Sequence, residues 1–121
     1  MCIGHVSTVK PKSKGWGYKV FRIEKDGIHS AFTRVLNPWR TWITAIDSGG
    51  NEPGFHIYAT RRSAEKCLVW YEERQWDLAP QQRVNFRIFK VHYRKATKQG
   101  TGDGGFTSNS RVILAQEIFI P

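Results

Sequence analysis

The sequence predicts a single-domain α+β fold, in which about six mostly antiparallel strands carry one principal helix packed on the sheet. The chain has 121 residues, the usual size of one domain with one core. Hydrophobic residues make up 40% of it and charged residues 24%, so it needs neither metal nor disulfide to fold. One segment repeats apolar residues with helical spacing, whereas several others alternate apolar and polar residues as strands do.

The first third of the chain is predicted to be an arm followed by a hairpin. Residues 1–15 end in a polar, lysine-rich run without periodicity and are expected to form a flexible basic N-terminal arm before a single domain over 16–121. A strand is expected over 18–23. The Asp26-Gly27 pair then predicts a hairpin turn, and a second strand returns over 28–35.

Further strands are expected on both sides of a loop. Asn37-Pro38 ends the second strand, and residues 39–46, rich in Trp, Thr and Ile, are predicted to form a third. The Gly- and Pro-containing segment 48–54 is expected to be a loop, and 55–59 a short strand.

The clearest helix signal covers residues 61–74, with Thr60 as the expected N-cap. Its apolar residues recur at the spacing of a single buried stripe. They are Ala64, Cys67, Leu68 and Tyr71. We therefore expect Cys67 to be a buried free thiol.

Two strands are predicted in the last third of the chain. In residues 83–93 the alternation of apolar and polar residues shifts by one position at 88–89, which predicts a β-bulge. Residues 100–105 are expected to be a flexible glycine-rich loop. Residues 111–120 are apolar on both faces and are predicted to form a central strand.

The charge of the chain predicts a polyanionic partner. The formal net charge is +9, and the segment from Arg83 to Lys98 holds six cations and no acid. We expect binding of nucleic acid or of a nucleoprotein complex, while an acidic protein surface and solubility alone remain alternatives. The expected binding residues are Lys10, Lys12, Lys14, Trp39, Trp42, Arg83, Arg87, Lys90, Arg94, Lys95 and Lys98.

Aromatic and basic residues interleave in the same region, as they do in sheets that bind single strands. The alternation predicts that Phe86 and Phe89 belong to the core. The residues left for the solvent form a cationic sheet face, which consists of Arg87, Lys90, His92 and Arg94. Such a face is expected to bind by charge rather than by reading a sequence.

Other classes of site are not expected. The histidines and cysteines lack the spacing of a zinc site, the glycine-rich segment lacks the Gly-Lys-Ser/Thr of a phosphate-binding loop, and no nucleophile motif is present. We therefore predict no metal and no cofactor. The longest apolar run is far shorter than the ~20 residues that span a bilayer, so no membrane partner is expected. Only two cysteines and no signal peptide predict a cytoplasmic protein.

Part of the chain resembles ADP-ribosyltransferase-like domains. The strand from Gly54 to Ala59 with the following helix resembles their Gly-φ-Tyr-φ-Ala strand and Ala-x-x-Tyr helix, where φ is apolar. The end of the chain, with Glu117 before three apolar residues and Pro121, resembles the strand that begins with their catalytic glutamate. The resemblance implies, as the alternative function, an enzyme that uses NAD. Its site would consist of Arg22, His56 and Glu117, with Arg22 as the partner of the Glu117 carboxylate.

A second resemblance involves small proteins of phages and mobile elements. A Met-Cys start, a Tyr-Lys-Val strand, a Gly-Phe-His strand and a closing Ala-x-Glu strand are similar to uncharacterised proteins of that kind. This resemblance implies a non-enzymatic accessory protein in a bacterial host cell, for example a host-defence inhibitor that works by binding. Binding without catalysis is therefore the preferred interpretation of the sequence.

Overall fold

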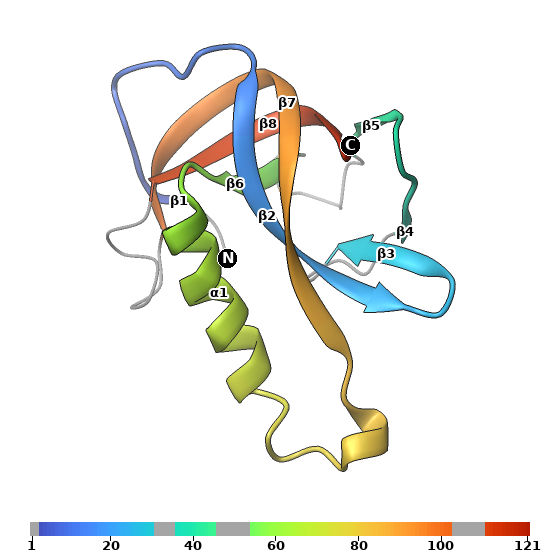
Figure 1. Ribbon diagram of the computed structural model, residues 1–121. Helices are drawn as coiled ribbons and strands as arrows, with labels where there is room; N and C mark the ends of the chain where they lie inside the picture. Colours follow the sequence, from blue (N-terminus) through green and yellow to red (C-terminus); the bar gives the residue numbers. More distant parts are fainter. Residues whose placement is uncertain (1–2, 31–35, 46–53, 103–110) are drawn as a thin grey trace.

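The computed structural model describes residues 3–30, 36–45, 54–102 and 111–121 (Figure 1). These residues form one antiparallel sheet with one α-helix against it, which confirms the predicted single-domain α+β fold. Eight strands are described, of which six are four residues or longer. The elements are β1 (Ile3–Val6), β2 (Gly15–Glu24), β3 (Gly27–Ser30), β4 (Leu36–Asn37), β5 (Trp42–Thr44), β6 (Phe55–Tyr58), α1 (Arg61–Glu73), a 3₁₀ turn (Pro80–Gln82), β7 (Asn85–Gly102) and β8 (Arg111–Phe119).

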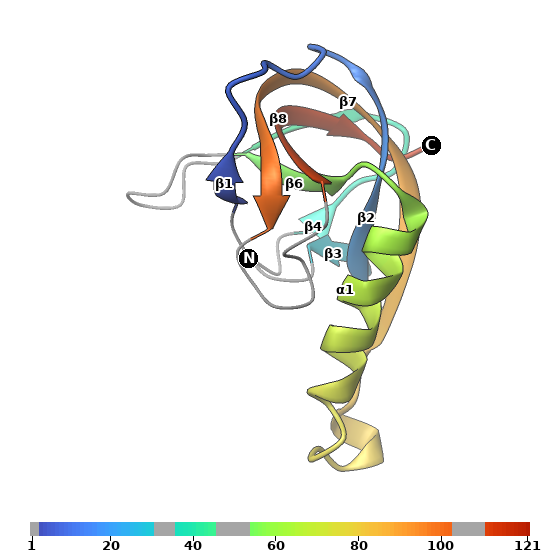
Figure 2. The same ribbon diagram turned by 90° about the vertical axis from the view of Figure 1, so that its left-hand side faces the viewer.

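Four strands of the sheet close into a ring. β7 pairs with β2 along one part of its length and with β8 along another, while β6 pairs with β8 and with β2. The ring closes where Tyr18 of β2 lies opposite Tyr58 of β6. Figure 2 shows the sheet curling around its interior, with α1 outside it. β8 has partners on both edges, so the prediction of a central last strand is confirmed.

Gly17 allows β2 and β6 to approach closely where the ring closes. A Cβ atom at this position would overlap Cγ2 of Ile57 and would lie 3.0 Å from the carbonyl oxygen of Tyr58. Any larger residue would therefore push the two strands apart beside the pair that joins them.

The interior of the ring holds the main core. Nine buried residues form it, and Phe21 is fully buried among them with its ring edge-on to Phe89 at 5.6 Å. The members are Phe21, Ile28, Ile57, Val91, Tyr93, Ile113, Ala115, Ile118 and Ile120. They come from β2, β3, β6, β7, β8 and the residue after β8, so the core forms only when these five strands are assembled.

A lysine points into this apolar interior. Lys19 lies on the same side of β2 as Phe21, and its Nζ donates a hydrogen bond of 3.0 Å to the carbonyl oxygen of His56. The Nζ is also 6.0 Å from the ring centroids of Phe21 and Phe55. Burial lowers the pKa of Lys19 to about 8, because the charged amine loses its hydration.

Helix α1 packs on the outer face of the ring and forms a second core. It begins after Thr60, whose side chain accepts a hydrogen bond of 3.2 Å from the backbone N–H of Ser63, as the N-cap prediction requires. Ala64, Cys67 and Tyr71 are buried against Val20, Tyr58 and Val112. Cys67 is buried and takes part in no disulfide among the described residues, as predicted, and burial raises the pKa of its thiol.

The predicted β-bulge at 88–89 is wrong. Val20 faces Ile88 and Lys19 faces Phe89 in unbroken register. The alternation shifts because different layers cover the two faces of β7: Phe86 and Ile88 pack under α1, whereas Phe89 packs on the interior. The irregularities occur later instead, where Lys95 has a left-handed φ of 56° and the pairing with β8 shifts between Ala96 and Lys98.

The structure also revises several strand boundaries. The segment predicted as an arm contains β1, which pairs with the end of β7, so its beginning is part of the sheet. The strand expected over 39–46 begins only at Trp42, after Arg40, whose left-handed φ of 53° departs from extended backbone. Residues 100–102, expected in a loop, belong to β7. The rest of that loop, most of the loop over 48–54, residues 31–35 and Cys2 lie outside the described residues.

Candidate functional site

A continuous run of four aromatic rings crosses the outer face of the ring of strands. The rings belong to Trp16 of β2, His92 of β7, Trp42 of β5 and Phe119 of β8. Trp16 stacks on His92 at 4.3 Å with only 2° between the planes. Trp42 lies 5.6 Å from His92 and also 5.6 Å from Phe119, in tilted arrangements. We call these four side chains the aromatic run.

Strand alternation explains why these rings point outward. His92 lies between the interior residues Val91 and Tyr93, and Phe119 lies between Ile118 and Ile120. Trp16 and Trp42 are likewise next to residues that face inward, Gly17 and Ile43. Because successive side chains of a strand point to opposite faces, all four rings are placed on the outside. Helix α1 covers another part of the same outer face, around Val20, Tyr58 and Val112, which we call its lower part. The aromatic run lies on the part that α1 leaves uncovered, which we call the upper part.

Two cations lie against the aromatic run. The guanidinium carbon of Arg94 is 3.9 Å from the centroid of the Trp42 ring, and Lys90 Nζ is 5.3 Å from that of Trp16. Both geometries are those of cation–π contacts. Trp16 remains 50% exposed although His92 covers one face of its ring. The surface therefore offers an accessible ring with a positive charge beside it.

A carboxylate orders the cations at this end of the sheet. Glu117, only 7% exposed, accepts hydrogen bonds from Arg94, from Lys95 at 3.5 Å and from the hydroxyl of Thr44 at 3.2 Å. The bond from Arg94 and the charges of Arg94 and Lys95 lower the pKa of Glu117 below its usual value. Glu117 thus stays ionised and holds Arg94 in place over Trp42.

Only part of the predicted cationic face is confirmed. Lys90, His92 and Arg94 share the outer face, as predicted. Arg87 lies on the opposite face, since no bulge separates it from Phe89, and its predicted place beside Lys90 is wrong. Lys95 pairs with Glu117, as Arg94 does. Lys98 lies beyond the register shift of β7 and faces Leu114 of β8.

The three predicted lysines of the N-terminal segment lie near the same end of the sheet. Lys10, Lys12 and Lys14 are exposed in the connection from β1 to β2. The carbonyl of Ser13 accepts a hydrogen bond of 3.0 Å from the N–H of Ala96, which places Lys12 and Lys14 near the bend of β7.

Arg83 and Trp39 lie away from the aromatic run. Arg83 donates to the carbonyl oxygens of Leu78 and Trp76, which gives it a structural role in the turn after α1. Trp39 is edge-on to Phe89 at 5.3 Å, and Phe89 packs on the interior.

The residues of the NAD-dependent alternative are dispersed. Arg22 pairs with Glu24 at 3.2 Å, and Glu117 pairs with Arg94 and Lys95, so the predicted Arg22–Glu117 pair is wrong. Arg22 faces Phe86 of β7 whereas Glu117 faces Arg94, which is roughly 26 Å further along an extended strand. His56 lies on β6, opposite Leu114. The three side chains do not form a common site.

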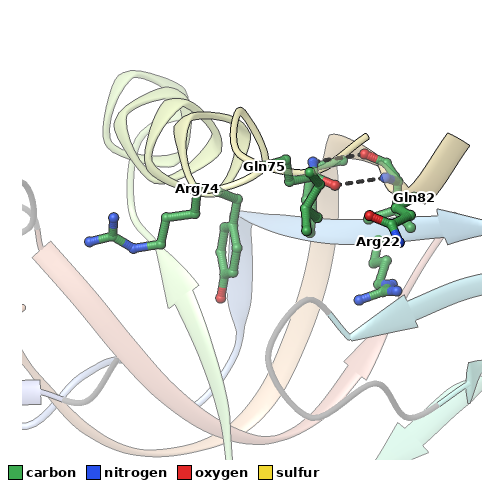
Figure 3. A pocket seen from close by; sticks show the side chains of 8 residues that line it. Arg22, Arg74, Gln75 and Gln82 are labelled. Atoms are coloured by element: carbon green, nitrogen blue, oxygen red, sulfur yellow. Dashed lines mark hydrogen bonds between the residues drawn. The ribbon is translucent and has the colours of Figure 1, made fainter. Parts of the chain in front are cut away.

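A hollow of about 270 Å³ lies between the end of α1, the 3₁₀ turn and strands β2 and β7 (Figure 3). Its floor includes Tyr71 stacked on Phe86 at 4.9 Å, and Gln75 closes one wall through two hydrogen bonds to the backbone of Val84. Arg22 lines it but pairs with Glu24, and in Figure 3 the side chain of Arg74 points away from Arg22. The two guanidinium groups therefore do not converge on one ligand.

One group of side chains has the composition of a metal site. Ligand atoms of Glu24, Asp26 and His29, at the β2–β3 turn, lie within 4.8 Å of one another. They already satisfy each other: His29 Nε2 is 2.7 Å from Asp26 and 3.3 Å from Glu24, and Arg22 binds Glu24 as well. The bond to His29 lowers the pKa of Asp26. The group is consistent with a turn stabilised by ion pairs.

Sequence reasoning missed two members of the aromatic run, Trp16 and Phe119. The predicted first strand starts at residue 18, after the observed start at Gly15, so it omits Trp16. The alternation around Ile118 and Ile120 predicts an outward Phe119, but which strands are neighbours is set only by the tertiary fold.

Among the described residues no helix is long and apolar enough to cross a membrane. Comparison of the chain with models of protein families, with curated proteins and with solved structures finds no match.

Proposed function

We propose that this protein binds nucleic acid without catalysis, through the aromatic run and the lysines and arginine around it. The observation that carries the proposal is the continuity of four rings across four strands, with Lys90 and Arg94 in contact with them. Rings of this kind contact bases, and cations contact phosphates. The net charge of +9 favours the same class of partner over long distances.

Two features support this surface over others of the molecule. The lower part of the outer face is already covered by α1, and the hollow beside it has no convergent charges. The upper part combines an accessible tryptophan with exposed lysines at positions 12, 14 and 90. The buried Glu117 is neutralised by two cations, so it does not repel a phosphate strongly.

Reversing Lys12, Lys14 and Lys90 to Glu is expected to weaken binding about tenfold or more in low salt and to flatten the salt dependence. Log affinity should fall linearly with log salt, at roughly 0.9 per phosphate neutralised on duplex DNA, and each lost contact lowers that slope. Fluorescence anisotropy of labelled oligonucleotides at several salt concentrations measures both quantities. Arg94 and Lys95 stay intact, because they hold Glu117.

The matched control reverses Lys25, Arg62 and Lys66, which are exposed on the β2–β3 turn and on α1. Each reversal lowers the net charge by two, so both triple variants fall from +9 to +3. The control should bind more tightly than the first variant. Equal weakening would mean that no particular surface is used. If the wild-type protein does not bind at low salt, nucleic acid is the wrong partner, and the charge serves an acidic protein surface or solubility.

A further inference from the structure

We infer that the surface selects single-stranded nucleic acid and that Trp16 is the platform on which one base stacks. This inference rests on the proposed function and adds the form of nucleic acid that is bound. It derives from the geometry of the aromatic run, in which the four rings are not equivalent.

Trp16 and His92 present one flat stack. Their planes differ by only 2°, and Trp16 is half exposed at the outer end of the pair. A base placed on the exposed part of the Trp16 ring, beside the Lys90 Nζ that lies 5.3 Å from its centroid, would continue this stack. The stacked His92 and the nearby Lys90 hold the indole in place, so little side-chain entropy is lost on binding.

Trp42 is a support rather than a second platform. It is tilted by 41° against His92 and by 48° against Phe119, so it does not extend the flat stack. The guanidinium of Arg94 lies on its ring, and Glu117 holds that guanidinium. The face of Trp42 that meets Arg94 is thus already occupied.

A duplex cannot use such a platform, because each base face inside it is covered by its neighbours. Away from the two ends of a duplex, only an unstacked base reaches Trp16. A duplex would contact the lysines through its phosphates alone, so its affinity would depend on charge and not on Trp16. Base stacking on Trp16 and phosphate contacts of the lysines are therefore two separate contributions, and only the first depends on the form of the nucleic acid.

The test compares the full chain and its variants on an oligothymidylate of about 12 nucleotides and on a duplex of the same length. Trp16→Leu should weaken binding of the single strand about 5- to 150-fold, the usual range for one stacked base, and should leave duplex binding unchanged. Trp16→Phe keeps an aromatic ring and should retain much of the preference for the single strand. It also shows that strand β2 of the protein tolerates substitution at this position. Trp76→Leu is the matched control, since Trp76 is 71% exposed beyond α1.

The outcomes separate the two proposals. A wild-type protein that prefers the single strand, and loses the preference in Trp16→Leu but not in Trp76→Leu, supports the inference. Equal binding of both forms by the wild type, unchanged in Trp16→Leu, overturns the inference and leaves the proposed function in place. Equal losses on both forms in Trp16→Leu also overturn it. Failure of the wild type to bind either form overturns the proposed function itself.

Discussion

Phe21→Ala is expected to lower the free energy of unfolding by about 3–5 kcal/mol. Phe21 is 0% exposed and is among the largest side chains of the interior core. Its removal loses both the burial of the ring and the edge-on contact with Phe89, and it leaves a cavity that the closed ring of strands cannot collapse around. A truncation at this position should therefore be among the most destabilising in the protein.

Thermal and urea denaturation followed by circular dichroism measure this loss. For a chain of this size the midpoint temperature should fall by about 10–20 °C. Val69→Ala is the matched control, because Val69 is exposed on α1, and its effect should stay within about 0.5 kcal/mol. A loss below about 1 kcal/mol for Phe21→Ala would mean that the ring of strands is not filled as described.

The second large effect is expected at Lys19, where Lys19→Met should stabilise the protein at pH 7. The pKa of Lys19 is about 8 in the folded protein and 10.5 normally. At a pH below 8 the native state must keep a charged amine in an apolar interior, which costs up to about 3 kcal/mol at 1.36 kcal/mol per pKa unit. Methionine fills the same space without a charge. The lost hydrogen bond to His56 offsets about 1 kcal/mol of the gain.

The pH profile separates this effect from a simple packing change. Between pH 8 and 10.5 the unfolded chain holds a proton on Lys19 that the folded chain has released, so wild-type stability gains from rising pH over that window. The advantage of Lys19→Met should therefore shrink as pH rises from 8 to 10. Cys67 and Tyr71, whose pKa values burial raises, act in the opposite direction. The charge of Lys19 lowers the pKa of Cys67, so Lys19→Met raises that pKa further, which also makes the advantage of the variant shrink at high pH.

Urea denaturation of both proteins between pH 7 and 10 provides the measurement. Lys66→Met is the matched control, because Lys66 is exposed on α1 and its removal takes no amine out of the interior. A stability difference between Lys19→Met and wild type that stays constant over this range would contradict the buried position of the amine.

Local features of the fold were predictable from the sequence. The stripe of Ala64, Cys67 and Tyr71 places α1 correctly, because a single helix face is buried and its period is visible. Thr60 marks its start because the cap uses the backbone of the next turn. These signals lie within a few residues of each other and need no knowledge of the tertiary fold.

The pattern of β7 was misinterpreted for a tertiary reason. Its two faces are buried by different partners in different parts of the strand: α1 covers Phe86 and Ile88, and the interior covers Phe89 and Val91. A period-two pattern assumes that one face is buried throughout, so the change of partner looked like a bulge. The misplacement of Arg87 followed directly from this assumption.

The charges of the site were predictable, and so were Trp42 and His92, whereas Trp16 and Phe119 were missed. Lys90 and Arg94 stand out because no acid lies near them in the sequence. The neighbours Trp16, Trp42 and Phe119 come from three strands that are distant in the chain, and only the pairing of β2, β5, β7 and β8 brings them together. Arg22 was the predicted partner of Glu117. The observed partner is Arg94, because the register between β7 and β8 places Arg94 opposite Glu117.

The most direct test of the proposed interface uses the five tryptophans as internal reporters. Each indole N–H gives one signal in a spectrum of the ¹⁵N-labelled full chain, and variants such as Trp16→Phe assign them. On addition of an oligothymidylate at low salt, the signals of Trp16 and Trp42 should shift or broaden. Those of Trp70 and Trp76, on α1 and in the turn beyond it, should stay in place. Unchanged signals of Trp16 and Trp42, or shifts confined to Trp70 and Trp76, would contradict binding at the aromatic run.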